Sequence, residues 1–402
     1  MIEHCRKENT LSAPLSAVRA ERLRVKVLRR RELEYCSLWR TAFASHRKDR
    51  RFYELVEDTI HQDFDYRYFA IIDENGQARA VQPFLMVDQD LLAGVPTRLV
   101  AWVSLARRVW PRFMRLRTLM VGCAAGEGHL DGADEATRCV NARALAATIL
   151  EHARSLDTPL VVLKEFPASY RAALQCFVEK GFARMPSMPM ACLNIDYLNF
   201  DDYVRRKLSK DMRYKLRRKF REAAQAGPIE MSQIGDVTPV VDEIYPLYLQ
   251  VYERSTLRFE KLTKEFLCEL GRRMPDKVRF FLWRQGGRII AFSVCTVQRD
   301  AIYAEYLGLD YTVALQLHLY FVVMRDLISW AMANGYKSLH STGLNYDPKY
   351  RLRYLLNPLD LYVRHTSPVI NCLLRSVLPL LEPTRYDTNL KRFSNFHELH
   401  GS

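Results

Sequence analysis

Short apolar runs bounded by turn residues predict β-strands along much of the chain. In the first half we expect strands at 68–72, 80–86, 116–121, 159–164 and 190–195, with the last closing a first sheet. The Asn-Gly pair at 75–76 lies between the first two strands and is typical of a β-hairpin turn. Helical spacing predicts helices at about 136–154 and 168–180, and Gly181 is a helix-ending residue.

The second half repeats this order. We expect helices at 240–255, 264–273 and 313–333, and strands at 278–284, 288–297, 301–308, 338–342 and 359–364. The glycine-containing turn at 285–287 predicts a second hairpin, and the strand at 359–364 is expected to close a second sheet. The fold class is therefore α+β (mixed α/β), with two halves, each a mixed, mostly antiparallel sheet flanked by helices.

A strongly basic segment separates the halves. Between Tyr203 and Gln225 there are ten Lys or Arg and two acids, and apolar residues recur at every fourth position, which predicts a helix. This helix either grips a polyanion through phosphate contacts, lies on an anionic membrane, or is a solvated linker whose apolar stripe packs on both halves. We divide the chain into a basic lead-in (1–50), a first domain (51–200), a basic linker helix (201–227), a second domain (228–366) and a C-terminal tail (367–402).

Composition narrows the function classes. The 402 residues are 49% hydrophobic and 26% charged, as in a folded globular protein of two domains. The net charge of +14 favours nucleic acid, anionic lipid or phosphorylated ligands such as coenzyme A. Nine scattered cysteines without a CxxC pair argue against a metal site and a disulfide framework.

These features also predict where the protein works. Charged residues in the first ten positions argue against a secretory signal. A run of eighteen apolar residues does not occur, so we expect no membrane-spanning helix. We expect a cytoplasmic protein. The apolar run at 368–381 either docks on the domain or lies at the inner face of the membrane, which would make the protein peripheral.

Several segments of the second half resemble the GNAT superfamily of acyltransferases, and in particular its CelD/FemAB-like members. The segments are 287–293 (GRIIAFS), 303–311, the helix end at 330–335, 338–343, and 346–364 with its Tyr-Asp-Pro-Lys-Tyr-Arg element. The basic helix is similar to the one that joins the halves in that group. The resemblance implies two GNAT-like halves and acyl transfer to an amine or hydroxyl of a cell-envelope or polysaccharide precursor. It implies as donor either an acyl-CoA, acetyl-CoA among them, or an aminoacyl-tRNA.

The resemblance also directs attention to a phosphate loop. GNAT enzymes hold the CoA pyrophosphate on backbone N–H groups of a glycine-rich loop at a helix start. Gly126 and Gly128 fit that pattern in the first half, whereas the corresponding segment 310–315 has no glycine. We take these two glycines as candidate CoA-binding residues; the alternative is an ordinary glycine-rich loop.

Two further residue sets carry candidate chemistry. Lys349, Arg351 and Arg353 alternate in a segment predicted to be extended, so they would share one face and bind a substrate phosphate or carboxylate; the alternative is a charged edge strand. The candidate catalytic residues flank the expected splay between the central strands. They are Glu305, His340 and Tyr346. The alternatives are a core histidine for His340 and a structural partner of an arginine for Glu305.

The favoured function is N- or O-acyl transfer from acyl-CoA, without a metal, to a small-molecule or to a lipid- or nucleotide-linked acceptor. A FemAB-like transferase using charged tRNA is the second hypothesis, and a catalytically degenerate GNAT-like binding module in polysaccharide biosynthesis is the third. Among macromolecular partners, an anionic membrane surface ranks ahead of RNA. The acyl chain and the acceptor are not encoded in any pattern that we find.

Overall fold

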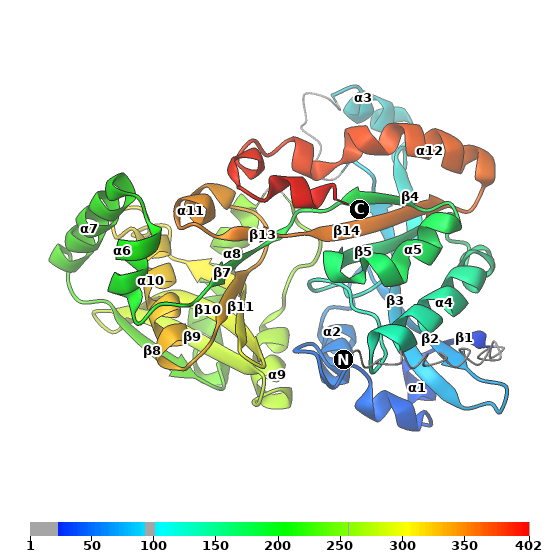
Figure 1. The fold of residues 1–402 in the computed structure, drawn as a ribbon, viewed down its shortest axis with the longest axis horizontal. Helices are drawn as coiled ribbons and strands as arrows, with labels where there is room; N and C mark the ends of the chain where they lie inside the picture. The colour runs from blue at the N-terminus through cyan, green and yellow to red at the C-terminus, as the bar shows by residue number, and fades with distance from the viewer. Residues whose placement is uncertain (1–22, 93–100, 256, 402) are drawn as a thin grey trace, which may run out of the picture.

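The computed structural model describes residues 23–92, 101–255 and 257–401, which form two β-sheets flanked by helices (Figure 1). Within these residues each sheet has seven strands, mostly antiparallel, and one neighbouring pair in each sheet is parallel. The prediction of an α+β fold with two similar, mostly antiparallel halves is confirmed.

The first sheet has the strand order β1-β2-β3-β4-β5-β14-β6. Its strands are β1 (Arg24–Leu28), β2 (Asp65–Ile72), β3 (Ala78–Asp90), β4 (Arg115–Val121), β5 (Leu160–Pro167), β14 (Leu359–His365) and β6 (Ala183–Pro186). The predicted hairpin is β2–β3, and Gly76 in its turn has φ of 79°, a conformation that glycine adopts without a steric penalty.

The second sheet has the strand order β13-β7-β12-β11-β10-β9-β8. Its strands are β13 (Leu355–Asn357), β7 (Met190–Asn194), β12 (Ser338–Ser341), β11 (Ala301–Leu309), β10 (Arg288–Gln298), β9 (Val278–Gln285) and β8 (Glu230–Ile234). The second predicted hairpin is β9–β10, which turns through Gly286 and Gly287.

The two halves exchange one strand each. β14 lies between β5 and β6 of the first sheet, and β7 lies between β12 and β13 of the second. The predictions that 190–195 closes the first sheet and 359–364 the second are therefore wrong, because apolar alternation specifies the faces of a strand but not its neighbours. With the exchange taken into account, both sheets have the same order, and the exchanged strand holds the same position in each.

Helices cover both sheets. They are α1 (Arg30–Leu33), α2 (Arg50–Thr59), α3 (Ala101–Val109), α4 (Glu135–Ser155), α5 (Arg171–Glu179), α6 (Phe200–Lys207), α7 (Lys210–Gln225), α8 (Val241–Arg254), α9 (Lys264–Arg273), α10 (Leu319–Ala333), α11 (Tyr346–Arg351) and α12 (Pro368–Leu381). In the part of the chain that the structure describes, every helix is too short or too polar to cross a bilayer.

Three apolar clusters hold these layers together. One joins the first sheet to α4 and α5, and a second joins the second sheet to α6, α7 and α10. The third joins the two halves and includes Leu55 of α2, Leu247 of α8, Phe266 of α9 and Phe292 of β10. Because this third cluster is continuous and apolar, burial of its surface favours a fixed arrangement of the halves.

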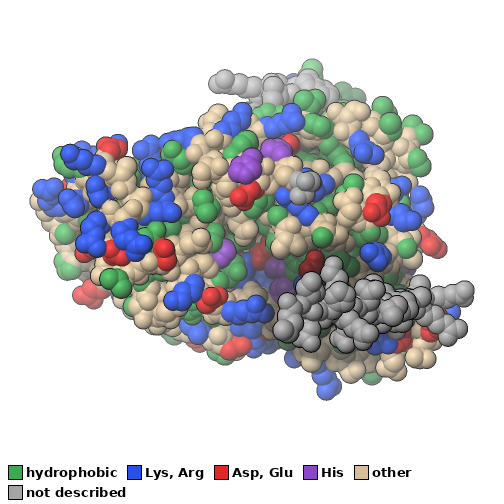
Figure 2. All heavy atoms as spheres, in the orientation of Figure 1, with side chains coloured by type: hydrophobic (Ala, Val, Ile, Leu, Met, Phe, Trp, Pro, Cys, Tyr) green, Lys and Arg blue, Asp and Glu red, His purple; other side chains and the backbone are tan. Residues whose placement is uncertain are grey.

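The basic segment between the halves forms two helices instead of the single one predicted. The chain is extended at Leu208, and Ser209 caps α7 by accepting a hydrogen bond from the backbone N–H of Met212 at 3.3 Å. Met212 and Leu216 are buried, so the apolar side of α7 packs on the second half. Figure 2 shows Lys and Arg side chains gathered at the end of the molecule where α6 and α7 lie.

Candidate active site

A cleft of about 2080 Å³ lies between the two halves and is lined by residues of both. It reaches the point in each sheet where the parallel strands diverge. In the second sheet the pairing of β11 with β12 ends at Ala304 and Ser341, whereas β11 continues to Leu309. Glu305 and Thr342, the next residues on the two strands, line the cleft.

The first sheet has an equivalent strand opening, that is, a point where its two parallel strands diverge. Its parallel pair, β4 and β5, is paired as far as Val121 and Leu163, and Lys164 follows directly on β5. Lys164 and the neighbouring Glu165 line the same cleft. Both strand openings therefore face one shared space.

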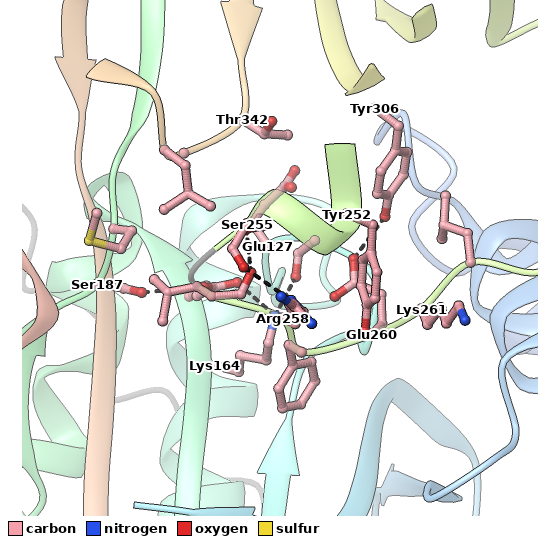
Figure 3. A pocket seen from close by; sticks show the side chains of 18 of the residues that line it. Glu127, Lys164, Ser187, Tyr252, Ser255, Arg258, Glu260, Lys261, Tyr306 and Thr342 are labelled. Carbon is pink, nitrogen blue, oxygen red and sulfur yellow. Dashed lines mark hydrogen bonds and ion pairs between the residues drawn. The ribbon is translucent and has the colours of Figure 1, made fainter. Parts of the chain in front are cut away.

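A polar cluster spans this space from one half to the other (Figure 3). Lys164 Nζ lies 2.6 Å from Glu165 Oε2 and donates a hydrogen bond to the carbonyl oxygen of Gly126 at 3.0 Å. On the opposite side, the hydroxyl of Tyr306 on β11 donates to Glu260 Oε1 at 3.1 Å. Figure 3 shows Lys164 on one side of the pocket and Glu260 with Tyr306 on the other.

The charges in this cluster influence one another. Burial raises the pKa of Glu260 above its ordinary value, and the attraction of Lys164 offsets only part of this effect. Burial lowers the pKa of Lys164, but Glu165 and Glu260 outweigh it and leave that pKa raised. A carboxylate with a raised pKa, held by a tyrosine hydroxyl and facing an open cleft, is suited to accept a proton from an incoming nucleophile.

Lys349 lies in the wall of the same cleft, next to the end of β12. It is 3% exposed, and its Nζ donates hydrogen bonds to the carbonyl oxygens of Thr342 and of Leu344, the latter at 2.8 Å. Burial lowers the pKa of Lys349 to about 7. Its proton is therefore less firmly held near neutral pH than that of an exposed lysine.

The predicted binding face of Lys349, Arg351 and Arg353 does not form. The segment is the helix α11, not an extended strand, and Pro348 lies in its first turn, where proline is compatible with a helix. Arg351 pairs with Asp347 at 2.7 Å, and Arg353 is exposed with φ of 60°. Of the three side chains, Lys349 lines the cleft.

A buried ionic cluster links the halves beneath the cleft. Arg47, which is 1% exposed, pairs with Glu127 of the first half and with Glu305 of the second. Lys48 Nζ lies 2.8 Å from Glu127 Oε2 and 3.6 Å from Glu305 Oε2. The guanidinium carbon of Arg47 lies 4.1 Å from the ring centroid of Tyr303. Two cations thus face two carboxylates, which satisfies the requirement that buried charges be paired.

The three predicted catalytic residues occupy different environments. Glu305 lines the cleft but is bound by Arg47 and accepts a hydrogen bond from Thr296 Oγ1 at 2.7 Å, so the alternative of a structural arginine partner describes its contacts. The hydroxyl of Tyr346 donates to the carbonyl oxygen of Pro189 at 2.7 Å, and this ring is 1% exposed.

His340, the third of these residues, stacks on the Tyr303 ring at 4.4 Å between centroids. Its Nε2 lies 3.6 Å from Cys192 Sγ. Burial lowers the pKa of His340 to about 4 and raises that of Cys192 to about 11, so both groups are held neutral. Neither residue belongs to the described lining of the cleft.

The glycines of the predicted phosphate loop are needed for packing within the protein. A Cβ on Gly126 would lie 1.9 Å from Lys48 Nζ, and one on Gly128 would lie 2.6 Å from the carbonyl oxygen of Lys164. The N–H of Gly128 already donates to the carbonyl oxygen of Glu165 at 3.1 Å. These contacts fit the alternative of an ordinary glycine-rich loop better than a phosphate cradle.

The corresponding turn of the second half is also internally bonded. Asp310 is 1% exposed and accepts hydrogen bonds from the backbone N–H of Thr312 at 3.0 Å and from its hydroxyl at 2.6 Å. Beside this turn, the guanidinium of Arg254 lies 4.1 Å from the ring centroid of Tyr311. Arg254, Arg258 and Lys261 line the cleft and are exposed, so phosphate groups bound near them would meet cationic side chains.

Sequence reasoning missed Lys164, Glu260 and Tyr306. Glu260 lies in a segment between helices without regular pattern, and Arg47 lies in the basic lead-in, where it was one cation among many. The available signal was positional. Lys164 ends the strand predicted to follow the helix at 136–154. The equivalent strand of the second half is the one that contains His340.

Comparison with known proteins supports the assignment of the second half. Residues 210–350 match the family model described as "Acetyltransferase (GNAT) domain". No curated protein matches the sequence.

Among solved structures, L-PGS from Bacillus licheniformis is 11% identical with a TM-score of 0.49, and the match covers 84% of this chain and 97% of that one. FemX is 10% identical with a TM-score of 0.49 and coverages of 83% and 96%. A tandem GNAT protein from the clavulanic acid biosynthesis pathway is 11% identical with a TM-score of 0.42 and coverages of 86% and 99%.

The family model and the topology agree on the second half, and the first half repeats its strand order, including the parallel pair that opens onto the cleft. Residues 210–350 thus match a GNAT acetyltransferase domain, and they lie in the second of two halves that share one strand order.

Proposed function

We propose that the chain transfers an acyl group from an acyl-CoA to an amine or hydroxyl of a cell-envelope or polysaccharide precursor in the cleft between its halves. The observation that carries this proposal is the position of Glu260, Tyr306 and Lys164 where both strand openings face the cleft. Acyl transfer needs a base for the nucleophile and donors for the developing oxyanion, and this cluster offers both kinds of group.

Glu260 is proposed as the general base that takes the proton from the acceptor. Its raised pKa brings it closer to neutral pH, where a base accepts a proton most effectively while still being ionised. Tyr306 orients Glu260 through its hydrogen bond, and the pKa of this hydroxyl is raised well above its ordinary value by burial, so it remains a donor. Lys164 supplies positive charge on the other side of the cleft.

The donor phosphates are proposed to lie against Arg254, Arg258 and Lys261. Arg254 lies beside the 310–318 turn that precedes α10, which is the part of a GNAT-type half where a donor phosphate is expected, and Arg258 and Lys261 lie near the Tyr252 ring in the same cleft. Cationic side chains would then bind the donor phosphates in place of the backbone N–H groups of a glycine-rich loop. Donor binding would therefore weaken as the salt concentration rises. The acyl thioester would extend from there toward the opening between β11 and β12.

Two measurements test this proposal. Calorimetric binding of acetyl-CoA and of longer acyl-CoAs should weaken in an Arg254→Gln/Arg258→Gln variant and stay unchanged in the control Arg205→Gln/Arg206→Gln, which removes equal charge from exposed residues of α6. Glu260→Gln should lower acyl transfer about 10²–10⁴-fold while leaving donor binding intact. Mass spectrometry of the purified protein would identify the acyl chain. Absence of thioester binding by the unmodified chain would refute the proposal.

A tRNA-dependent transferase is the second candidate, because α6 and α7 present a large cationic surface. Seven of its cations are exposed: Arg205, Arg206, Lys207, Lys210, Arg217, Arg218 and Arg221. Binding of RNA with a steep salt dependence, together with no affinity for acyl-CoA, would favour this candidate over the first. A binding module without catalysis would bind a precursor but leave both donors unreacted.

A further inference from the structure

The helix α12 exposes an apolar face to solvent. Five of its large aliphatic side chains are 40–73% exposed: Val369, Ile370, Leu373, Val377 and Leu380. At about 100° per residue these positions fall within one stripe about 100° wide on the helix surface. A helix on the surface of a globular protein normally presents polar residues outward, so this stripe is unusual.

The adjoining side of α12 is also apolar, and it is occupied. Leu378 is 6% exposed and belongs to the apolar cluster that joins the halves, and Leu374 packs against this cluster. Leu374, Leu378 and Leu381 line the cleft. The helix α12 therefore lies between the cleft and the exposed aliphatic stripe.

A second exposed apolar group lies on and after α3. Leu105, Val109 and Trp110 are 62–91% exposed. The strands that flank α3 reach the same cleft, since Leu91 and Arg117 line it together with the inner side chains of α12. In Figure 1 both helices lie along the upper side of the molecule.

Arginines accompany these apolar residues. Arg108 and Arg112 are exposed on or just after α3, Arg115 and Arg117 are exposed on β4 where they line the cleft, and Arg375 is exposed on the side of α12 away from the aliphatic stripe. Figure 2 shows hydrophobic side chains along this upper edge with Lys and Arg between them. Exposed aliphatic residues, a tryptophan and several arginines are the combination by which a protein surface binds an anionic bilayer.

We propose that the exposed face of α12, together with Leu105, Val109 and Trp110, binds the surface of an anionic lipid bilayer. The aliphatic side chains enter the boundary between headgroups and acyl chains, and the arginines remain at the lipid phosphates. The cleft then lies beside the membrane, behind the helix α12. If the chain carries out the proposed acyl transfer, on which this step rests, the acceptor class is an amine or hydroxyl carried by a lipid-anchored molecule.

The test is co-sedimentation of the full chain with vesicles of equal parts phosphatidylglycerol and phosphatidylcholine, and with phosphatidylcholine alone. The unmodified chain should bind the anionic vesicles more strongly, and high salt should reduce but not abolish the binding, because salt screens the arginines and not the apolar contact. Leu373→Glu/Val377→Glu should lower the partition coefficient at least about tenfold, since loss of one buried aliphatic side chain already suffices for that change.

The matched control is Tyr35→Glu/Leu198→Glu, which adds the same charges at two large apolar residues that are 91% and 88% exposed elsewhere. It should bind vesicles like the unmodified chain. Arg108→Gln/Arg112→Gln should weaken binding to the anionic vesicles and leave binding to phosphatidylcholine vesicles unchanged. Thermal melts of all variants report on folding.

Transfer to a water-soluble amine separates this inference from the proposed function, because Leu373 and Val377 do not line the cleft in the described structure. The α12 variant should retain that activity and lose transfer to a lipid-anchored acceptor. The inference is overturned if the unmodified chain does not bind anionic vesicles at low salt, or if the α12 variant binds them like the control. It is also overturned if the chain is a dimer in solution that the α12 variant dissociates, since a second copy would then cover this face.

Discussion

Arg47→Met provides the sharpest test of the buried ionic cluster. In the folded protein Arg47 is 1% exposed and contacts a carboxylate of each half, Glu127 and Glu305. Methionine has a similar length without the charge, so the substitution leaves two buried carboxylates facing the single amine of Lys48. Removing one partner of a buried ion pair costs about 3–5 kcal/mol, because the remaining charge is left uncompensated. We expect the lower end of this range, since Lys48 contacts both carboxylates.

Urea denaturation followed by tryptophan fluorescence measures this cost. The control is Arg206→Met, because Arg206 also pairs with a carboxylate, that of Asp202 at 3.3 Å, but its side chain is 51% exposed. Because Arg206 is solvent-exposed and Asp202 keeps Arg205 as a partner at 2.7 Å, the control should lose at most about 1 kcal/mol. Equal losses in the two variants would show that Arg47 and its partners do not form the desolvated cluster seen in the structure.

A double variant tests the charge balance directly. In Arg47→Met/Glu305→Gln, one cation and one carboxylate are removed, and Lys48 and Glu127 remain as a pair at 2.8 Å. The double variant should therefore be more stable than the sum of the single losses predicts, by about 0.5–3 kcal/mol. Additive losses would contradict the reasoning, because they would mean that the two groups do not interact.

Three further predictions follow from the structure. Lys349→Met should cost about 1–3 kcal/mol in urea unfolding and sharply reduce transfer, because the carbonyl oxygens of Thr342 and Leu344 lose their donor, whereas Arg351→Ala should stay within about 0.5 kcal/mol and remain active. Burial lowers the pKa of His46 to about 3 and that of His340 to about 4, below the ordinary 6.5, so their contribution to stability is present above pH 6.5 and is lost as the pH falls toward 3. Unfolding curves across this range should show the loss, and a His46→Gln/His340→Gln variant should show a shallower one. Changing Arg205, Arg206, Arg217 and Arg221 to Gln should weaken RNA binding and flatten its salt dependence in filter binding, with no change in thermal melting.

The two-hairpin pattern made much of the fold predictable from sequence. Asn-Gly and Gly-Gly turns between apolar runs specify which strands pair, because a short turn leaves one register. The two hairpins β2–β3 and β9–β10 were therefore predicted correctly. The exchange of β7 and β14 was not predictable in this way, since the apolar alternation of each strand fits either sheet.

The candidate site was harder to predict, because its residues come from distant parts of the chain. Lys164 and Glu260 are brought to one cleft by tertiary packing, and no local pattern distinguishes Glu260 from other acids in loops. Lys349 was found because it stands in a recognisable motif, but its extended conformation was predicted wrongly, since Pro348 is compatible with the first turn of α11 as well as with a strand. The motif thus led to a residue that lines the cleft, although the predicted backbone conformation was wrong.

The strand exchange explains why the cleft has a fixed shape. Moving the halves apart would break the pairing of β7 with β12 and β13 and of β14 with β5 and β6. It would also separate Arg47 from one of its two carboxylates. A hinge opening of the kind seen between loosely joined domains therefore has a high cost here, and the cleft that faces both strand openings is built into the fold. In the proposed acyl transfer, selection among acceptors would then come from the side chains on the walls of the cleft and from two surfaces at its edges. These surfaces are the cations of α8 and its following segment, and the apolar side chains of α12.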